Sequence, residues 1–188
     1  LNVAMHLSGI ATSTALLVTK LSGSNVKLAD TRKTTPGIRI FEKYAFRCGG
    51  GINHRLGLDD AAMLKENHIE WSTGISESIK ILKGTIPWTK KVIVEAETPT
   101  QAKEAVEAGA DGVLLDEMPI ETIEKLVPEL RQLSKTSKSK YVSKNIVIEV
   151  SGINPNNLTD YIFTGIDLIS TSAPITKSKW IDFSMRFD

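Results

Sequence analysis

Basic side chains gather in the first third of this 188-residue chain, where they follow short apolar runs. Arginine binds a carboxylate through two parallel hydrogen bonds, and lysine supplies a point charge. Several such cations at one place would therefore suit a small molecule that carries more than one carboxylate. The alternative is that the Arg-Lys pair is simply solvated in a loop. The candidate cations are Arg32, Lys33, His54, Arg55 and Lys65.

Two carboxylates, Glu95 and Asp116, lie at the ends of later apolar runs. If these runs are neighbouring strands, the two side chains can share a Mg²⁺ ion, which prefers oxygen ligands. The alternative is that each carboxylate pairs with a lysine or arginine close to it.

Small residues follow the last apolar runs, as Ser151-Gly152 and Thr171-Ser172. Turns of this kind near the start of a helix expose backbone N–H groups, which bind phosphate in many barrels. A plain turn before a helix that is capped near Asn154 is the competing interpretation of the first pair. The cations, carboxylates and turns together favour a site for a charged small molecule with a phosphate.

The elements that must hold these side chains alternate between apolar strands and amphipathic helices, which is typical of parallel β/α units. Strands are predicted at residues 26–29, 61–65, 92–96, 112–116, 146–150, 167–170 and 181–187. The chain is short for an eight-fold barrel, which typically has about 250 residues. We therefore predict an α/β fold, an irregular, open β/α barrel with about six to seven parallel strands, with an open α/β sheet as the alternative.

Helices are predicted between these strands from the apolar periodicity and the turn residues. They cover residues 3–21, 36–47, 74–82, 98–109, 119–133 and 154–163, with Thr34 or Thr35 as the cap of the second. Arg39, Lys43 and Arg47 share one face of that second helix and are interpreted as a solvated basic stripe. The polar, lysine-rich residues 134–145 are interpreted as a surface loop.

The composition argues against several classes of protein. A net charge of +1 argues against non-specific nucleic-acid binding, and the chain lacks the run of about 18–20 apolar residues that spans a membrane. The single cysteine, Cys48, excludes an internal disulfide and favours a reducing compartment, the cytoplasm. No histidine or aspartate is placed by the sequence to activate Cys48 as a nucleophile, and the three histidines lack the spacing of a zinc site.

Several longer motifs now point to one family. They are LSGIAT at residues 7–12, DTRKTTPG at 30–37, EKYAFRCGGGINHRLGLDD at 42–60 and KENHI at 65–69, followed in order by VEAET, LLDEM, IEVSGIN and GIDLIS. Together they resemble the quinolinate phosphoribosyltransferases over essentially the whole chain. The resemblance implies phosphoribosyl transfer from phosphoribosyl pyrophosphate (PRPP) to quinolinate with decarboxylation. The products would be nicotinate mononucleotide, CO₂ and pyrophosphate, in NAD biosynthesis.

The resemblance also implies roles for the candidate residues. Those that would bind the two carboxylates of quinolinate are Thr31, Arg32, Lys33, His54, Arg55 and Lys65, with Lys33 also catalytic. Glu95 and Asp116 would be catalytic, handling the ribose and Mg²⁺. The turns at Ser151, Gly152, Thr171 and Ser172 would bind the 5′-phosphate. The chain departs from the family at Ile153 and Ser172, where the family usually has glycine.

The family further implies how the molecule is organised. Residues 1–188 would form the β/α-barrel catalytic domain behind a separate amino-terminal domain upstream. The enzyme would be a homodimer or higher homo-oligomer, in which an arginine from upstream of Leu1 serves the partner's site. Solubility and turnover would then depend on that upstream part.

Three other functions are weighed against this one. The first is a related enzyme that takes nicotinate without decarboxylation, or a similar paralogue of unassigned substrate. A monocarboxylate such as nicotinate would need fewer cations than the five noted above. A barrel with Lys33 or Lys65 as a Schiff-base nucleophile would be revealed by borohydride trapping. A non-catalytic phosphate-binding barrel would have no use for both Glu95 and Asp116.

Overall fold

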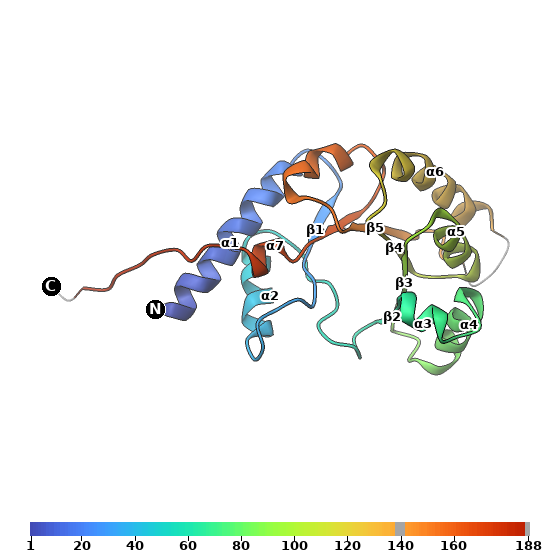
Figure 1. Cartoon of the computed structure of the whole chain (residues 1–188), viewed down its shortest axis with the longest axis horizontal. Coiled ribbons are helices and arrows are strands. Elements are labelled where there is room, and N and C mark those ends of the chain that lie inside the picture. The colour runs from blue at the N-terminus through green and yellow to red at the C-terminus, as the bar shows by residue number, and fades with distance from the viewer. Residues whose placement is uncertain (138–141, 187–188) are drawn as a thin grey trace.

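The computed structural model describes residues 1–137 and 142–186, which form a six-stranded parallel sheet with helices on its outer side. The strands are β1 (Lys27–Ala29), β2 (Ala62–Leu64), β3 (Val92–Ala96), β4 (Gly112–Asp116), β5 (Val147–Ser151) and β6 (Leu168–Ser170). They lie in the order β1-β6-β5-β4-β3-β2. The sheet therefore curves from β1 to β2 through all the later strands (Figure 1).

The two end strands, β1 and β2, do not pair with each other, so the barrel stays open between them. The segment of residues 52–61 crosses this opening. It is attached to β1 by one isolated bridge, in which the Ile52 N–H donates to Leu28 O at 2.9 Å and the Asp30 N–H donates to Ile52 O at 3.1 Å. The predicted irregular, open β/α barrel is thereby confirmed, with six strands.

Eight helical segments connect and flank the strands in the described residues. They are α1 (Asn2–Lys20), α2 (Arg39–Cys48), α3 (Glu66–Glu70), α4 (Ile75–Thr85), α5 (Pro99–Ala108), α6 (Ile120–Thr136), the 3₁₀ helix η1 (Pro155–Tyr161) and α7 (Ala173–Thr176). Helix α5 shows how local sequence determines where a helix begins and ends. Thr98 and Gln101 form a capping box at its start, and Gly109 ends it with φ of 97°.

Side chains along a strand point alternately into the core and into the site. In β4, Val113 and Leu115 are fully buried among the apolar residues of the core, whereas Leu114 and Asp116 line a cavity inside the barrel. Functional side chains therefore come from every second residue of a strand, and each has a buried aliphatic neighbour that fixes the backbone.

Several predicted boundaries were wrong. Residues 181–186 form no strand; the Ile181 N–H donates to Met5 O of α1 at 3.1 Å, and the segment then extends away from the sheet, past the start of α1 (Figure 1). Helix α2 begins at Arg39 instead of residue 36, because Pro36-Gly37 form a turn in which Gly37 has a φ of 84°, and no side chain caps it. Residues 155–161 form a 3₁₀ helix, which Asn154 caps through Asn156 N.

The lysine-rich segment 134–145 is only partly a surface loop. Helix α6 continues through Thr136, and the Ser134 hydroxyl is buried and donates to Ser143 O. Lys144 and Asn145 are exposed, and residues 138–141 lie outside the described residues. Within the described part of the chain, no helix is long and apolar enough to cross a membrane.

Candidate active site

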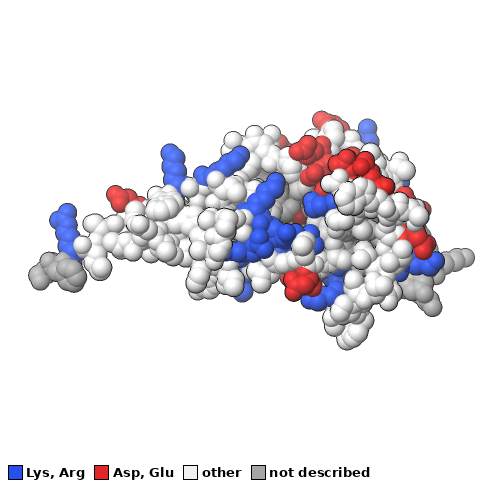
Figure 2. Space-filling model, turned by 60° about the horizontal axis from the view of Figure 1, so that its bottom comes forward, with Lys and Arg blue, Asp and Glu red and all other residues white. Residues whose placement is uncertain are grey.

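A cavity of about 630 Å³ opens at the carboxyl ends of the strands, inside the curve of the sheet. Every residue that the sequence analysis assigned to a site lines it, although these residues come from β1 to β6 and from the segment 52–61. Figure 2 shows basic side chains mainly to one side of this hollow and acidic side chains to the other. The structure thus brings the predicted residues together, and their roles in binding and catalysis stay predictions.

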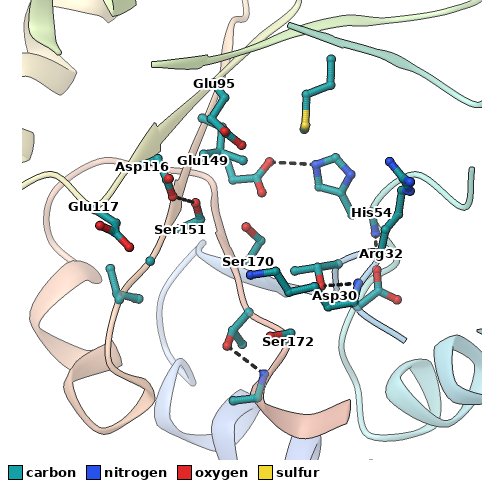
Figure 3. A pocket seen from close by; sticks show the side chains of 18 of the residues that line it. Asp30, Arg32, His54, Glu95, Asp116, Glu117, Glu149, Ser151, Ser170 and Ser172 are labelled. Carbon is teal, nitrogen blue, oxygen red and sulfur yellow. Dashed lines mark hydrogen bonds and ion pairs between the residues drawn. The ribbon is translucent and has the colours of Figure 1, made fainter. Parts of the chain in front are cut away.

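Strand register arranges the acidic side of the cavity in two layers. Glu95, Leu114 and Glu149 are register partners on β3, β4 and β5, and Asp116 pairs with Ser151 one layer nearer the opening. Paired residues of a parallel sheet point to the same face, so three carboxylates converge on the cavity (Figure 3). Glu149 lies in the deeper layer and is only 3% exposed.

A buried ion pair holds the basic side together. Lys43 on α2 is 2% exposed, and its Nζ lies 2.5 Å from Asp30 Oδ1 and 3.0 Å from His54 O. The other oxygen of Asp30 accepts from Asn53 Nδ2 at 2.6 Å, and its Oδ1 also accepts from the His54 N–H at 2.8 Å. Asp30 therefore ties α2 to the segment that carries His54 and Arg55.

The interpretation of Arg39, Lys43 and Arg47 as a solvated stripe was wrong for the first two. Lys43 is buried because its ammonium group pairs with the buried carboxylate of Asp30. Arg39 donates from Nε to Thr34 Oγ1 at 2.9 Å, from Nη2 to Arg32 O at 3.3 Å and from Nη1 to Leu56 O at 3.2 Å. It thus joins the two loops that carry cations of the cavity, and Arg47 alone is exposed.

The surroundings of the two arginines of the cavity, Arg32 and Arg55, favour an anionic ligand. Burial lowers the pKa of the Arg55 guanidinium, and the positive charge of Arg32 lowers it further. Arg55 Nη1 donates to Ala61 O at 2.8 Å, whereas Arg32 Nε is buried without an acceptor among the described residues. A buried donor in this state favours an anionic ligand beside it.

Both candidate metal ligands already have one partner. Glu95 forms an ion pair with Lys65, and Asp116 accepts a hydrogen bond from the Ser151 hydroxyl. Each carboxylate retains a further oxygen, and Mg²⁺ is commonly held by one or two carboxylates together with substrate phosphates. The described residues contain no group of three or more acidic, histidine or cysteine ligands that would hold a metal by themselves. One further oxygen on each carboxylate suits a Mg²⁺ ion that a substrate phosphate also holds, and the Mg²⁺ site stays a prediction.

The rim beside these carboxylates is strongly acidic. The charge of Glu66 is the largest cause that raises the pKa of Glu97, followed by desolvation and by the charge of Asp116. Glu97 is exposed and does not line the cavity. A cation near Glu95 and Asp116 would relieve this mutual repulsion.

The turns proposed for phosphate lie side by side at the ends of β5 and β6. Gly152 has a φ of 74°, and a Cβ there would lie 3.1 Å from Glu117 N, so only glycine fits without displacing that backbone. Ser172 has an ordinary φ of –86°. Among the described non-glycine residues, only Glu117 has a positive φ, at 51°, so the departures at Ile153 and Ser172 strain no backbone.

His54 lies between the basic and acidic sides and uses both ring nitrogens within the chain. Its Nδ1 accepts from the Arg55 N–H at 2.7 Å, so the proton lies on Nε2, which donates to Glu149 Oε2 at 3.2 Å. His54 therefore positions the Arg55 backbone and bridges to β5 (Figure 3).

Sequence reasoning did not assign several lining residues to the site. Glu149 lies inside an apolar strand, where a lone carboxylate two residues before Ser151 was the available signal. Asp30 directly follows β1, but only its structural partners reveal its role. The missed lining residues are Asp30, Met63, Leu114, Glu117, Glu149, Ile153, Pro155, Ser170, Ala173 and Lys177.

Comparison with known proteins identifies the family of the chain. The sequence profile of the quinolinate phosphoribosyl transferase C-terminal domain matches residues 10–186. Probable nicotinate-nucleotide pyrophosphorylases [carboxylating] from Synechocystis sp. and Methanothermobacter thermautotrophicus are 42% and 41% identical to the chain, each over 99% of it. The chain spans 60% and 65% of the length of these relatives. The crystal structure of NadC from Streptococcus pyogenes superposes with a TM-score of 0.89 at 39% identity, over 100% of this chain and 62% of that one.

Proposed function

The chain belongs to the family defined by the C-terminal domain of quinolinate phosphoribosyl transferase, and we propose that it is the catalytic barrel of an enzyme that makes nicotinate mononucleotide. The reaction transfers the phosphoribosyl group of PRPP to quinolinate and releases pyrophosphate and CO₂, in NAD biosynthesis. The observation that supports it best is one cavity with two arginines on one side and the four carboxylates of Glu95, Asp116, Glu117 and Glu149 on the other.

The basic side suits a planar diacid. Arg32, Arg55 and Lys33 lie on two loops that Arg39 joins, so their spacing is held by the protein before a ligand binds. Lys65 contributes from the opposite edge of the open barrel, beside Glu95. A substrate with a single carboxylate, such as nicotinate, would leave part of this positive charge uncompensated.

The acidic side suits the sugar and a metal-bound pyrophosphate. Glu95 and Asp116 would hold Mg²⁺, which when bound neutralises the pyrophosphate leaving group. The turns at Ser151-Gly152 and Thr171-Ser172 would take the 5′-phosphate, with Lys177 as the cation at that end of the cavity.

The residues then act through position and charge. Nitrogen of the pyridine ring attacks C1 of the ribose as pyrophosphate leaves, and the sugar gains positive charge that nearby carboxylates stabilise. The positive ring nitrogen of the pyridinium intermediate stabilises the electron pair left on the ring carbon when the adjacent carboxylate leaves as CO₂, and a proton from solvent then takes the place of the carboxylate. The arginines and lysines orient the diacid, so that ring nitrogen faces the sugar.

A direct assay tests this function. The full-length protein is incubated with PRPP, Mg²⁺ and either quinolinate or nicotinate, and nicotinate mononucleotide and CO₂ are measured. We expect product from quinolinate, with release of one CO₂ for each nucleotide. Product from nicotinate alone would favour the related enzyme that does not decarboxylate. Loss of activity after borohydride treatment with a keto acid would favour the Schiff-base barrel.

We also propose that the enzyme works as a homodimer or higher homo-oligomer in the cytoplasm, with a partner arginine in each site. Apolar side chains exposed on α1 and α2 support association, among them Val3, Leu16, Ile40, Phe41 and Tyr44. Light scattering of the full-length protein measures the mass, and a monomer that retains full turnover would contradict this proposal.

A further inference from the structure

Glu149 presents a buried carboxylate oxygen that nothing else in the described chain satisfies. Its side chain is almost entirely buried, and Oε2 is engaged by His54 Nε2 at 3.2 Å. Oε1 is buried and has no hydrogen-bond donor among the described residues. An unsatisfied buried charge is costly, so such an oxygen is normally satisfied by a bound group.

The position of Glu149 shows where that group must lie. Its neighbours Ile148 and Val150 are fully buried in the core on the other face of β5. Glu149 itself faces the cavity in the layer below Ser151, and Figure 3 shows it between Glu95 and Asp116 on one side and His54 on the other. The free oxygen is therefore directed at a ligand in the centre of the cavity.

The chemistry of the two proposed substrates decides which part of them fits. At neutral pH quinolinate carries two carboxylates and a ring nitrogen, all of them acceptors, and they would repel Glu149. The phosphate oxygens of PRPP are acceptors as well. Only the ribose hydroxyls donate. The basic side lacks an acceptor instead of a donor, since Arg32 Nε is a buried donor with no acceptor among the described residues.

We propose that Glu149 accepts a hydrogen bond from a ribosyl hydroxyl and so determines where the sugar sits. This inference rests on the proposed function, because it takes the ribosyl group of PRPP as the ligand. Since His54 also accepts from the Arg55 N–H, Glu149 and His54 join the sugar position to the diacid position. The negative charge of Glu149 also lies beside the ring that gains positive charge in the reaction.

The test uses sugar phosphates that differ by one hydroxyl. Ribose 5-phosphate, 2-deoxyribose 5-phosphate and 3-deoxyribose 5-phosphate are titrated into the full-length protein and into Glu149→Gln by calorimetry. The unmodified protein is expected to bind ribose 5-phosphate about tenfold more tightly than one of the deoxy sugars, since a hydrogen bond to a charged group contributes at least that much. Glu149→Gln should lose most of this preference and bind quinolinate within about twofold of the unmodified protein.

A matched control removes a carboxylate at the rim. Glu97→Gln deletes the same charge from an exposed position outside the cavity and should retain the hydroxyl preference. If Glu149→Gln does not fold, Glu149→Asp replaces it, because it keeps the charge but withdraws the carboxylate by one methylene. The same loss of preference is expected.

Three results would overturn the proposal. They are no hydroxyl preference in the unmodified protein, an unchanged preference in the Glu149 variant, or an equal loss of quinolinate and sugar binding, which would mean that Glu149 acts only through His54. A hydroxyl preference that depends on Glu149, in a protein that makes no nicotinate mononucleotide, would instead refute the proposed function and leave this assignment standing.

Discussion

Burial lowers the pKa of Arg55, and Arg32 lowers it further because both side chains carry a positive charge and repel each other in the cavity. A diacid between them would remove this repulsion. We therefore expect Arg32→Ala or Arg55→Ala to weaken quinolinate binding about tenfold or more, from the loss of a charge-assisted contact of about 1.5–3 kcal/mol. PRPP binding, measured by calorimetry in the same full-length variants, should change far less. Equal losses for both substrates would mean that the arginines do not form the diacid site.

Asp116 can be replaced by a residue that keeps its hydrogen bond to Ser151. Asn at this position retains an oxygen that accepts from the Ser151 hydroxyl, while the negative charge is lost. Asp116→Asn should therefore slow turnover on the order of a hundredfold, as expected for a group that stabilises charge in the transition state. Quinolinate affinity should stay nearly unchanged. A collapse of quinolinate binding with turnover preserved would reverse the assignment of the two sides.

Glu97 offers a test by pH. Because Glu66 is the main cause of its raised pKa, Glu66→Gln should move the pKa of Glu97 back toward the usual 4.5. The sign follows from repulsion, since a neighbouring negative charge disfavours ionisation. A carbon-detected NMR titration of the full-length protein measures the shift. An unchanged titration in Glu66→Gln would mean that Glu66 is not the main cause of the raised pKa of Glu97.

Single residues also show how far sequence reasoning reaches. Arg32, Arg55 and Asp116 were predicted to share a site because they follow apolar runs, and strand ends of one sheet meet. Glu149 was missed because its role depends on the register that places it beside Leu114. Lys43 was misassigned because helical spacing gives its face but not the buried Asp30 that it meets.

Among the elements, those whose bounds are set by local chemistry were predicted best. Strands β3 and β4 were placed correctly, and the Thr98 cap and Gly109 stop gave the ends of α5. Residues 181–187 were predicted as a strand, yet the described ones form no strand, and Ile181 instead donates to Met5 O of α1. Whether an apolar segment joins a sheet depends on a free edge within reach, which no local pattern encodes.

Helix α2 connects to the sheet through its buried lysine, and this connection can be measured. Lys43→Met should destabilise the full-length protein by about 3–5 kcal/mol in chemical unfolding, because Asp30 would be left as an uncompensated buried charge. The double variant with Asp30→Asn should recover part of that loss. If the double variant is less stable than Lys43→Met alone, the hydrogen bonds of Asp30 to Asn53 and His54 matter more than its charge.

At the level of the whole molecule, the opening between β1 and β2 is the feature that unites fold and site. No ladder joins these strands in the described chain, and residues 52–61 cross between them with a single bridge to β1. Cations lie on both sides of the opening, with Arg32 after β1 and Lys65 after β2. A diacid bound to both would therefore connect the two ends of the sheet, a role that strand pairing performs in a closed barrel.

Quinolinate should accordingly stabilise this opening more than the rest of the barrel. We expect hydrogen exchange in residues 52–65 of the full-length protein to slow when quinolinate is added, while exchange in β3, β4 and α5, which are already paired or packed, stays the same. At a ligand concentration of about a hundred times Kd, binding to the native state adds about 2.7 kcal/mol to stability. Arg32→Ala is the matched control and should reduce the protection at the same quinolinate concentration. Protection confined to the turns after β5 and β6 would place quinolinate at the phosphate end and refute the charge division of the cavity.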